Sequence, residues 1–272
     1  MLRLEVIPDS KGRFNLCEFC PELKDVSCNT TINWNGEATY SYTKLGHIKY
    51  KFKTNEKVYI EFINLECDRL SFKNNIRLVS VSGELPRLNY GELNSMFEGC
   101  INLLTADGRL FKNNNHQTES IRVFKNCSIL DPDITVIQDL HSSKNFSEFY
   151  YGCRSIDDLP YPLFSDKQRD IEIIDGMFAE LPYLREVRGR LLDGVTGIKS
   201  AKRMFYRTGI TRLDNLFTSE EYIGKYVELD EFCADCKNLR HVNPNFFAYS
   251  SFPIPVDVKK SMFRNVPVKI NM

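Results

Sequence analysis

Cysteine is the residue type in this sequence with the most obvious capacity for chemistry. Two Cys-x-x-Cys pairs, Cys17/Cys20 and Cys233/Cys236, have the spacing of zinc knuckles, and a tetrahedral zinc site takes two such pairs. Zinc ribbons bring their knuckles together across about 15–20 residues, whereas these pairs lie near opposite ends of the chain. The nine cysteines are also an odd count, which argues against a disulfide framework. We therefore expect buried free thiols and no metal.

Histidines and paired carboxylates offer no clear catalytic site. Neither His47 nor His116 has another His, Cys or carboxylate at a known ligand or triad spacing, and no Gly-x-Ser-x-Gly, phosphate-loop or His-Glu-x-x-His motif is present. Paired carboxylates of the kind used by glycoside hydrolases occur at Asp131/Asp133, Asp157/Asp158 and Glu220/Glu221. Acidic residues in turns usually face solvent or cap short helices. We therefore expect no enzyme activity and no cofactor.

A short phrase of the form Met-Phe-x-x-Cys recurs through the last two thirds of the chain. Its copies occupy residues 96–100, 123–127, 149–153, 177–181, 204–208, 232–236 and 262–266. The second residue of each copy falls at 97, 124, 150, 178, 205, 233 and 263, so the copies lie 26–30 residues apart. Such a regular period indicates a repeat architecture.

Apolar residues follow each phrase at fixed distances. Most copies have one three residues after the phrase and another three further on, and copy five uses Ile210 and Leu213, one residue early. A third anchor follows the phrase by about eleven residues at Phe111, Phe164, Leu192 and Phe247, with Phe217 in copy five and no clear equivalent in copy two. The phrase predicts a short helical turn, and the Leu-x-x-Ile spacing predicts a short extended segment.

The last position of the phrase predicts packing rather than reactivity. Cysteine fills it in four copies, and Leu181, Thr208 and Val266 replace it in the others. A nucleophile or metal ligand would not be exchanged in this way. A unit of about 27 residues cannot enclose its own apolar face, so successive units must stack into a solenoid with one continuous core.

The repeated phrase resembles the BspA-like leucine-rich repeats, including those of bacterial surface proteins and of proteins encoded by bacteriophages. The resemblance covers roughly residues 80–272, and seven copies keep the register. It implies a leucine-rich-repeat solenoid of about seven repeats, although three copies lack the cysteine.

The first 80 residues have a different pattern. Short alternating or β-branched runs at 4–7, 14–16, 32–34, 38–42, 47–52 and 58–63 are separated by turn signals, among them Asn35-Gly36, which favours a hairpin. This spacing predicts a small β-sandwich. Trp34, Gly36, Tyr40 and the Gly46–Tyr50 segment resemble the pattern of PKD-like immunoglobulin-type domains, but the acidic residue of that pattern is missing.

Composition excludes several classes of protein. Lys and Arg total 36, as do Asp and Glu, and this balance argues against nucleic-acid or membrane-surface binding driven by charge. A hydrophobic content of 42% argues against disorder, and no apolar run approaches the roughly 20 residues of a spanning helix. The first residues lack the apolar core of a secretory signal, so we expect a chain made in a cytoplasm.

The outward residues of the short extended segments are the candidate partner-binding face. They are Asp157, Asp158, Arg185, Glu186, Arg240 and His241. A second candidate is the aromatic edge at Phe149, Tyr150, Tyr151 and Tyr161, because interfaces favour aromatic residues. The apolar last residues, 266–272, are expected to be covered by another chain.

The combined expectation is a mainly β protein with short helices: a PKD-like β-sandwich over residues 1–80 and a BspA-like solenoid over residues 81–272. The resemblance implies a non-enzymatic bacteriophage virion protein, associated with a tail, baseplate, fibre or head and assembled in the host cytoplasm. Its partners would be other virion proteins, further copies of itself, or a receptor or glycan of the host surface. A bacterial cell-surface adhesin and a polysaccharide-degrading enzyme remain alternatives.

Overall fold

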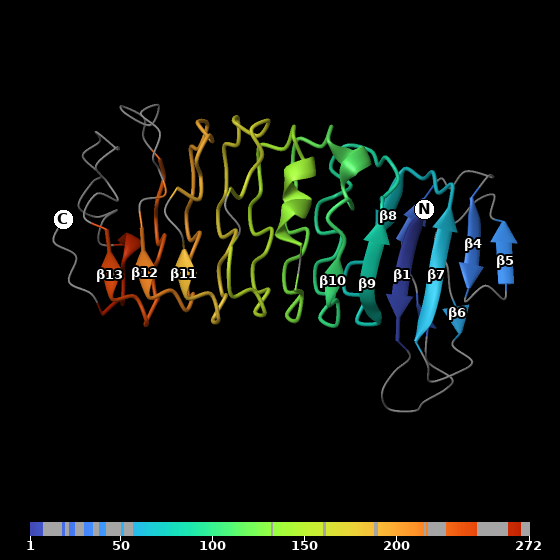
Figure 1. The fold of residues 1–272 in the computed structure, drawn as a ribbon, viewed down its shortest axis with the longest axis horizontal. Helices are drawn as coiled ribbons and strands as arrows, with labels where there is room; N and C mark the ends of the chain where they lie inside the picture. The colour runs from blue at the N-terminus through green and yellow to red at the C-terminus, as the bar shows by residue number, and fades with distance from the viewer. Residues whose placement is uncertain are drawn as a thin grey trace.

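The computed structural model describes most of the repeat region and the strands that precede it. The described residues are 1–7, 18–19, 22–24, 30–34, 38–41, 50–51, 57–131, 133–159, 162–187, 190–214, 216, 227–243 and 261–267. In this part of the chain, the elements are strands and short 3-10 helices joined by turns. Figure 1 shows a twisted sheet near the N-terminus that continues into a long row of stacked coils. The expected mainly β class is confirmed.

The N-terminal part is built around one six-stranded sheet. Its strands are β1 (Leu2–Val6), β4 (Thr31–Trp34), β5 (Ala38–Ser41), β7 (Val58–Ile63), β9 (Leu78–Gly83) and β10 (Thr105–Ala106), in the order β10-β9-β1-β7-β4-β5. Alternation decides which face is buried, because successive side chains of a strand point to opposite faces. In β1, for example, Leu2, Leu4 and Val6 are buried.

Most strands expected near the N-terminus are present. The runs at 4–7, 32–34, 38–42 and 58–63 overlap β1, β4, β5 and β7, and the run at 47–52 ends in β6 (Tyr50–Lys51). The hairpin is also confirmed, because β4 and β5 pair antiparallel up to Trp34 opposite Ala38. Residues 14–16 and 35–37 lie outside the described residues.

Further strands appear that the sequence did not indicate. Two small antiparallel pairs join β2 (Glu18–Phe19) to β6 and β3 (Glu22–Lys24) to β8 (Arg69–Ser71). β9 lies across the predicted domain boundary at residue 80. It pairs antiparallel with β1 and parallel with β10, so its two neighbours come from opposite sides of that boundary. One contiguous core extends from Leu2 to Phe263.

In copies one to six, the Met-Phe-x-x-Cys phrases form consecutive turns, and the expected helical turn is wrong in detail, whereas residues 261–262 at the start of copy seven are helical. The Phe97 N–H donates to the carbonyl of Val123 at 2.9 Å, and the Phe124 N–H donates to the carbonyl of Phe149 at 2.9 Å. Every second N–H of the phrase therefore bonds to the next coil, and the others close turns within their own coil, as the Cys100 N–H does to the Phe97 carbonyl at 3.1 Å. Residues with positive φ separate the turns, such as Gly99 at +75°, where an added Cβ would lie 2.3 Å from Asn74 Oδ1.

The stack includes one coil before the first recognised phrase. The Phe72 N–H donates to the Met96 carbonyl at 2.9 Å, and the Phe72 ring stacks on the Phe97 ring with centroids 5.4 Å apart. Asn102 donates to the Ile76 carbonyl at 2.7 Å. The sequence carries a weak signal for this coil, because Phe72 lies one period before Phe97 but lacks the following cysteine.

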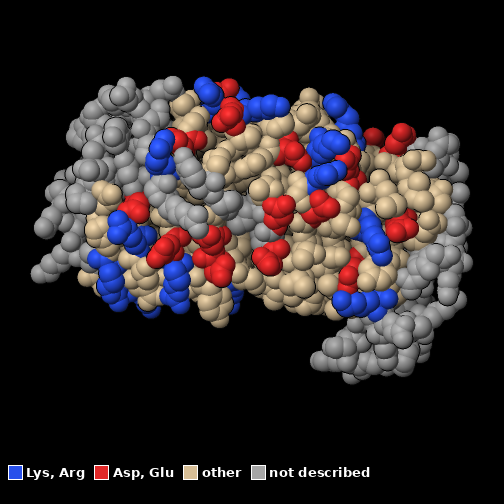
Figure 2. Space-filling model, viewed as in Figure 1, with Lys and Arg blue, Asp and Glu red and all other residues tan. Residues whose placement is uncertain are grey.

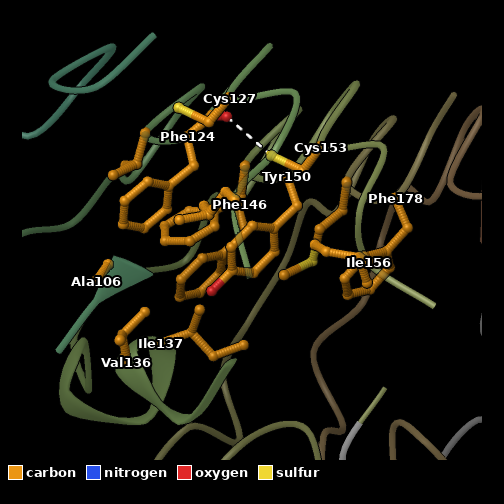
Figure 3. Close-up of a cluster of buried hydrophobic side chains, with 14 of the residues drawn as sticks. Ala106, Phe124, Cys127, Val136, Ile137, Phe146, Tyr150, Cys153, Ile156 and Phe178 are labelled. Carbon is orange, nitrogen blue, oxygen red and sulfur yellow. Dashed lines mark hydrogen bonds between the residues drawn. The ribbon is translucent and has the colours of Figure 1, made fainter. Parts of the chain in front are cut away.

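A column of rings forms the centre of the stack. Neighbouring rings lie 5.2–6.1 Å apart and nearly parallel along Phe72, Phe97, Phe124, Tyr150, Phe178 and Phe205. Figure 3 shows part of this column, with the Tyr150 ring between those of Phe124 and Phe178. Each ring is at most 1% exposed. Such contacts supply the area burial that a single coil cannot provide for itself.

The short extended segments align on one side of the coils. β11 (Glu186–Val187), β12 (Arg212–Leu213) and β13 (His241–Val242) form a parallel sheet, in the same row as β9 and β10 in Figure 1. The 3-10 helices η1 (Lys112–Asn114) and η2 (Ile134–Asp139) lie above this row in Figure 1. Copy two does have a third anchor, because Val136 and Ile137 of η2 are fully buried.

Candidate binding face

The two outward residues of each short extended segment are positioned by the two apolar residues around them. In copy four, Leu184 and Val187 are buried, so the intervening Arg185 and Glu186 face solvent. The same apolar-x-x-apolar frame recurs in the neighbouring copies. An outward row of side chains therefore follows from the packing of the inward ones.

The structure brings four of the six predicted face residues together. Glu186 of β11 lies opposite Arg212 of β12, which lies opposite His241 of β13. Arg185 and Arg240 directly precede Glu186 and His241 and belong to the same row. Register between parallel strands places these side chains at the spacing of adjacent strands, about 4.8 Å.

Asp157 and Asp158 occupy the equivalent positions one coil earlier, and both are exposed. No strand pairing joins them to β11 in the described part of the chain, so they extend the face without belonging to its sheet. Thr211 and Arg212 were not among the predicted face residues, and they complete the row between β11 and β13. The signal was present, because Ile210 and Leu213 frame them in the copy that slips by one residue.

Local contacts hold the basic side chains of this face. Arg240 donates to the carbonyls of Lys237 at 2.8 Å and Leu239 at 3.2 Å. Arg185 donates to the Gly209 carbonyl at 3.4 Å, and Arg212 pairs with Asp214 at 2.9 Å. The face is therefore a row of oriented charges on a rigid backbone.

The charges are unevenly distributed along the row. Coils two and three present the exposed acids Asp131, Asp133, Asp157 and Asp158, whereas the three later coils present four basic or histidine side chains and one acid: Arg185, Arg212, Arg240, His241 and Glu186. Figure 2 shows red side chains toward the middle of the row and blue ones along its lower edge over β11–β13. A partner with both signs of charge would fit this arrangement best, because complementary charge favours encounter and register.

The expected aromatic edge is not a surface. Phe149 and Tyr150 are fully buried and belong to the core, and Tyr150 lies in the ring column. Tyr151 is partly buried beneath the Lys125 ammonium, which lies 4.8 Å from the ring centroid. Tyr161 lies outside the described residues. The prediction fails because the repeat phrase turns its first two positions inward.

The described thiols of the repeat phrase link neighbouring coils. Cys100, Cys127 and Cys153 each donate at 3.0 Å to the carbonyl of an aromatic residue one coil earlier, and Cys236 does so at 2.9 Å. Burial raises the pKa of Cys100 to about 12. A protonated, enclosed thiol is neither a nucleophile nor a metal ligand, which agrees with the packing role expected from the sequence.

The Cys233/Cys236 pair is buried and free, and Cys17 and Cys20 lie outside the described residues. A hydrogen bond from Cys233 lowers the pKa of Cys236, whereas burial raises that of Cys233. Among the described residues, no three His, Cys, Asp or Glu side chains gather in a way that could hold a metal ion.

The described carboxylate pairs occupy structural or exposed positions. Asp133 accepts the Thr135 N–H at 3.1 Å and caps η2, as expected for an acidic residue before a short helix. Glu220 and Glu221 lie outside the described residues.

In the described part of the chain, no helix has the length and apolar character needed to cross a membrane.

Comparisons with known proteins assign no relative. No family model, curated protein or solved structure matches this chain.

Proposed function

We propose that this chain is a non-enzymatic structural and binding protein of a bacteriophage particle. In this proposal, a PKD-like β-sandwich docks the chain, and a BspA-like leucine-rich-repeat solenoid displays the outward row of residues 157–158, 185–186, 211–212 and 240–241. The sequence resemblance supports the family, and the stacked coils agree with it. The partners would be other virion proteins or the host surface.

One observation carries the proposal. The aromatic and sulfur side chains of the described repeat phrases point inward and bond or stack from coil to coil, while charged side chains form an ordered outer row. The side chains available to a partner are therefore those on the outer surface of the stack. Extended repeat surfaces of this kind are used for binding.

Mass spectrometry of purified phage particles tests the proposal directly. We expect peptides of this chain in a fixed ratio to the other virion proteins. Detection only in the soluble fraction of the infected host would contradict the virion role.

A charge-reversal variant tests the face itself. Replacing Arg185, Arg212 and Arg240 by Glu should reduce retention on particles at least about tenfold, because reversed charges oppose a complementary partner. Lys167→Glu is the matched control, since Lys167 is exposed and follows the Phe164 anchor rather than a face segment. Equal retention of both variants would mean that the outward row does not contact the partner on the particle.

A further inference from the structure

Coil five is the coil that contains the phrase at 204–208. It is one residue shorter than its neighbours at the corner, the residues that join the turn phrase to the extended segment. In the other copies, two residues span this corner, at 101–102, 128–129, 154–155, 182–183 and 237–238. In coil five, Gly209 alone connects Thr208 to Ile210. Because Thr208 and Ile210 are buried like their counterparts, the deletion is absorbed entirely at the surface.

The missing residue leaves a notch of about 360 Å³ between coils four and six. Its lining residues are Pro182, Arg207, Thr208, Gly209, Asp235, Lys237 and Asn238, and we call the part formed by Gly209 and Pro182 its floor. The Gly209 N–H donates to the Leu181 carbonyl at 3.0 Å, and an added Cβ would lie 2.1 Å from the Pro182 carbonyl oxygen. The floor is therefore closely packed backbone, and it has no side chain that could fill the notch.

The charges in the notch favour a neutral ligand. The Arg207 guanidinium lies 3.6 Å from a Glu180 oxygen and 3.9 Å from an Asp235 oxygen, so two carboxylates already offset its charge. Lys237 has no ion pair among the described residues and opposes a cationic ligand. A phosphate or sulfate would meet Arg207 and Lys237 together with both carboxylates. Arg264 also lies 3.9 Å from an Asp235 oxygen, but it is paired with Glu231 at 2.5 Å, so the net attraction of an anion would be small.

The polar groups nevertheless match a ligand that carries many hydroxyls. Asn265 already donates to one oxygen of Asp235 at 2.8 Å, and the carboxylate has further lone pairs. A hydroxyl both donates and accepts, so it can bond to these lone pairs, to the Arg207 and Lys237 donors, and to either atom of the Asn238 amide. At 3.6 and 3.9 Å, the Arg207 ion pairs are longer than hydrogen bonds and leave room for such contacts.

We propose that this notch binds one ring of a neutral saccharide. The Pro182 and Gly209 floor supports the ring, and Asp235, Arg207, Lys237 and Asn238 bond to its hydroxyls. The site deepens the display role proposed above and depends on it for the source of the sugar, a glycan of the host surface.

Saturation-transfer NMR on the full chain tests the site. The probes are glucose, galactose, mannose and N-acetylglucosamine, with glucuronate and inorganic phosphate as the anionic arm. We expect at least one neutral sugar to bind with a dissociation constant of about 1–10 mM and the anions to bind more weakly. No transfer to any neutral sugar at about 20 mM, or tighter binding of phosphate than of every sugar, would overturn the proposal.

Two kinds of variant locate the binding. Insertion of one asparagine after Gly209 restores the two-residue corner of the other coils, so the protein should fold while sugar binding falls at least tenfold. Asn238→Ala should weaken binding about threefold to tenfold, whereas Arg154→Ala, at the corner of coil three, should leave it unchanged. Sugar binding that survives the insertion in a folded protein would place the ligand elsewhere and overturn the assignment. Failure here leaves the particle analysis above unaffected, so the two proposals can fail separately.

Discussion

The N-terminal sheet and the coil stack build one core by two different rules. In the sheet, Leu4 of β1 lies opposite Ile60 of β7 and Val81 of β9, which are distant and unrelated in sequence. In the stack, Phe124 contacts its equivalents Phe97 and Tyr150. The sheet therefore depends on pairings that each occur once, whereas the stack depends on one pairing that is repeated along the chain.

The contrast between unique and repeated pairings predicts where a substitution should be tolerated. A slot that recurs along the stack already accepts several residues, as Cys153, Leu181 and Thr208 show for one position. A residue in the sheet has no such series. β9 belongs to both systems, because it pairs with β1 on one side and with β10 on the other.

The largest expected effect comes from Val81→Asp in β9. Val81 is 1% exposed and lies between Leu4 and Ala106, so an aspartate there would be buried without a partner and should cost more than about 4 kcal/mol of unfolding free energy. Hydrogen exchange followed by mass spectrometry should show both β1 and the first coils losing protection. If protection were lost on only one side of β9, the sheet and the coil stack would be units of independent stability.

Phe124→Ala should cost about 3–5 kcal/mol, because it removes a fully buried ring from the column. Urea denaturation measures the change. If the shared core makes the two regions cooperative, the variant should unfold in a single transition at a lower midpoint, and a biphasic curve would instead show that the coils unfold without the sheet.

Tyr150→Phe should stabilise the protein by about 1 kcal/mol. The Tyr150 hydroxyl is buried without a hydrogen-bond partner among the described groups, and the other rings of the column are phenylalanines. Removing it relieves a desolvation cost. A rise in the thermal midpoint is the expected readout, and a fall would indicate that the hydroxyl is bonded within the core.

Cys153→Ala should cost about 1 kcal/mol, through loss of the thiol bond to the Phe124 carbonyl. Cys153→Ser should cost less, because a hydroxyl keeps the donor in a slot where Thr208 is accepted in another coil. Paired chemical denaturation of the two variants measures the difference. A serine variant less stable than the alanine variant would mean that the cost of burying the hydroxyl exceeds the gain from its hydrogen bond.

The smallest expected effect is a pH dependence through Glu148, which pairs with Arg122 and Lys125 across neighbouring coils. Burial alone would raise the pKa of Glu148, but hydrogen bonds from Lys125 and Arg122 leave it below its ordinary value. Its contribution, less than about 1 kcal/mol, is present above the unfolded pKa of about 4.3 and is lost as pH falls through the lower folded value. Glu148→Gln should flatten the pH profile of stability in this window.

The repeat was predictable because each inward position recurs in several copies along the sequence. Seven phrases at one period were enough to indicate stacking, and the exchange of cysteine at the last position indicated packing instead of chemistry. The third anchor of coil two was not predicted, because Ile137 lies in a 3-10 helix at a position shifted from that of the other anchors. The aromatic edge failed for a related reason, because an aromatic residue at Phe149 looks the same in sequence whether it faces the core or the solvent.

The amino-acid pattern was enough to predict the mainly β class, the period of the stack and the residues that each coil turns inward, because apolar side chains must leave water and one coil cannot shelter them. The turn geometry depends on contacts between coils, since alternate N–H groups bond to the next coil rather than within their own. The tertiary structure also decided the joint at β9 and the alignment of Glu186, Arg212 and His241. These features depend on pairings between distant segments, for which a single sequence carries no local signal.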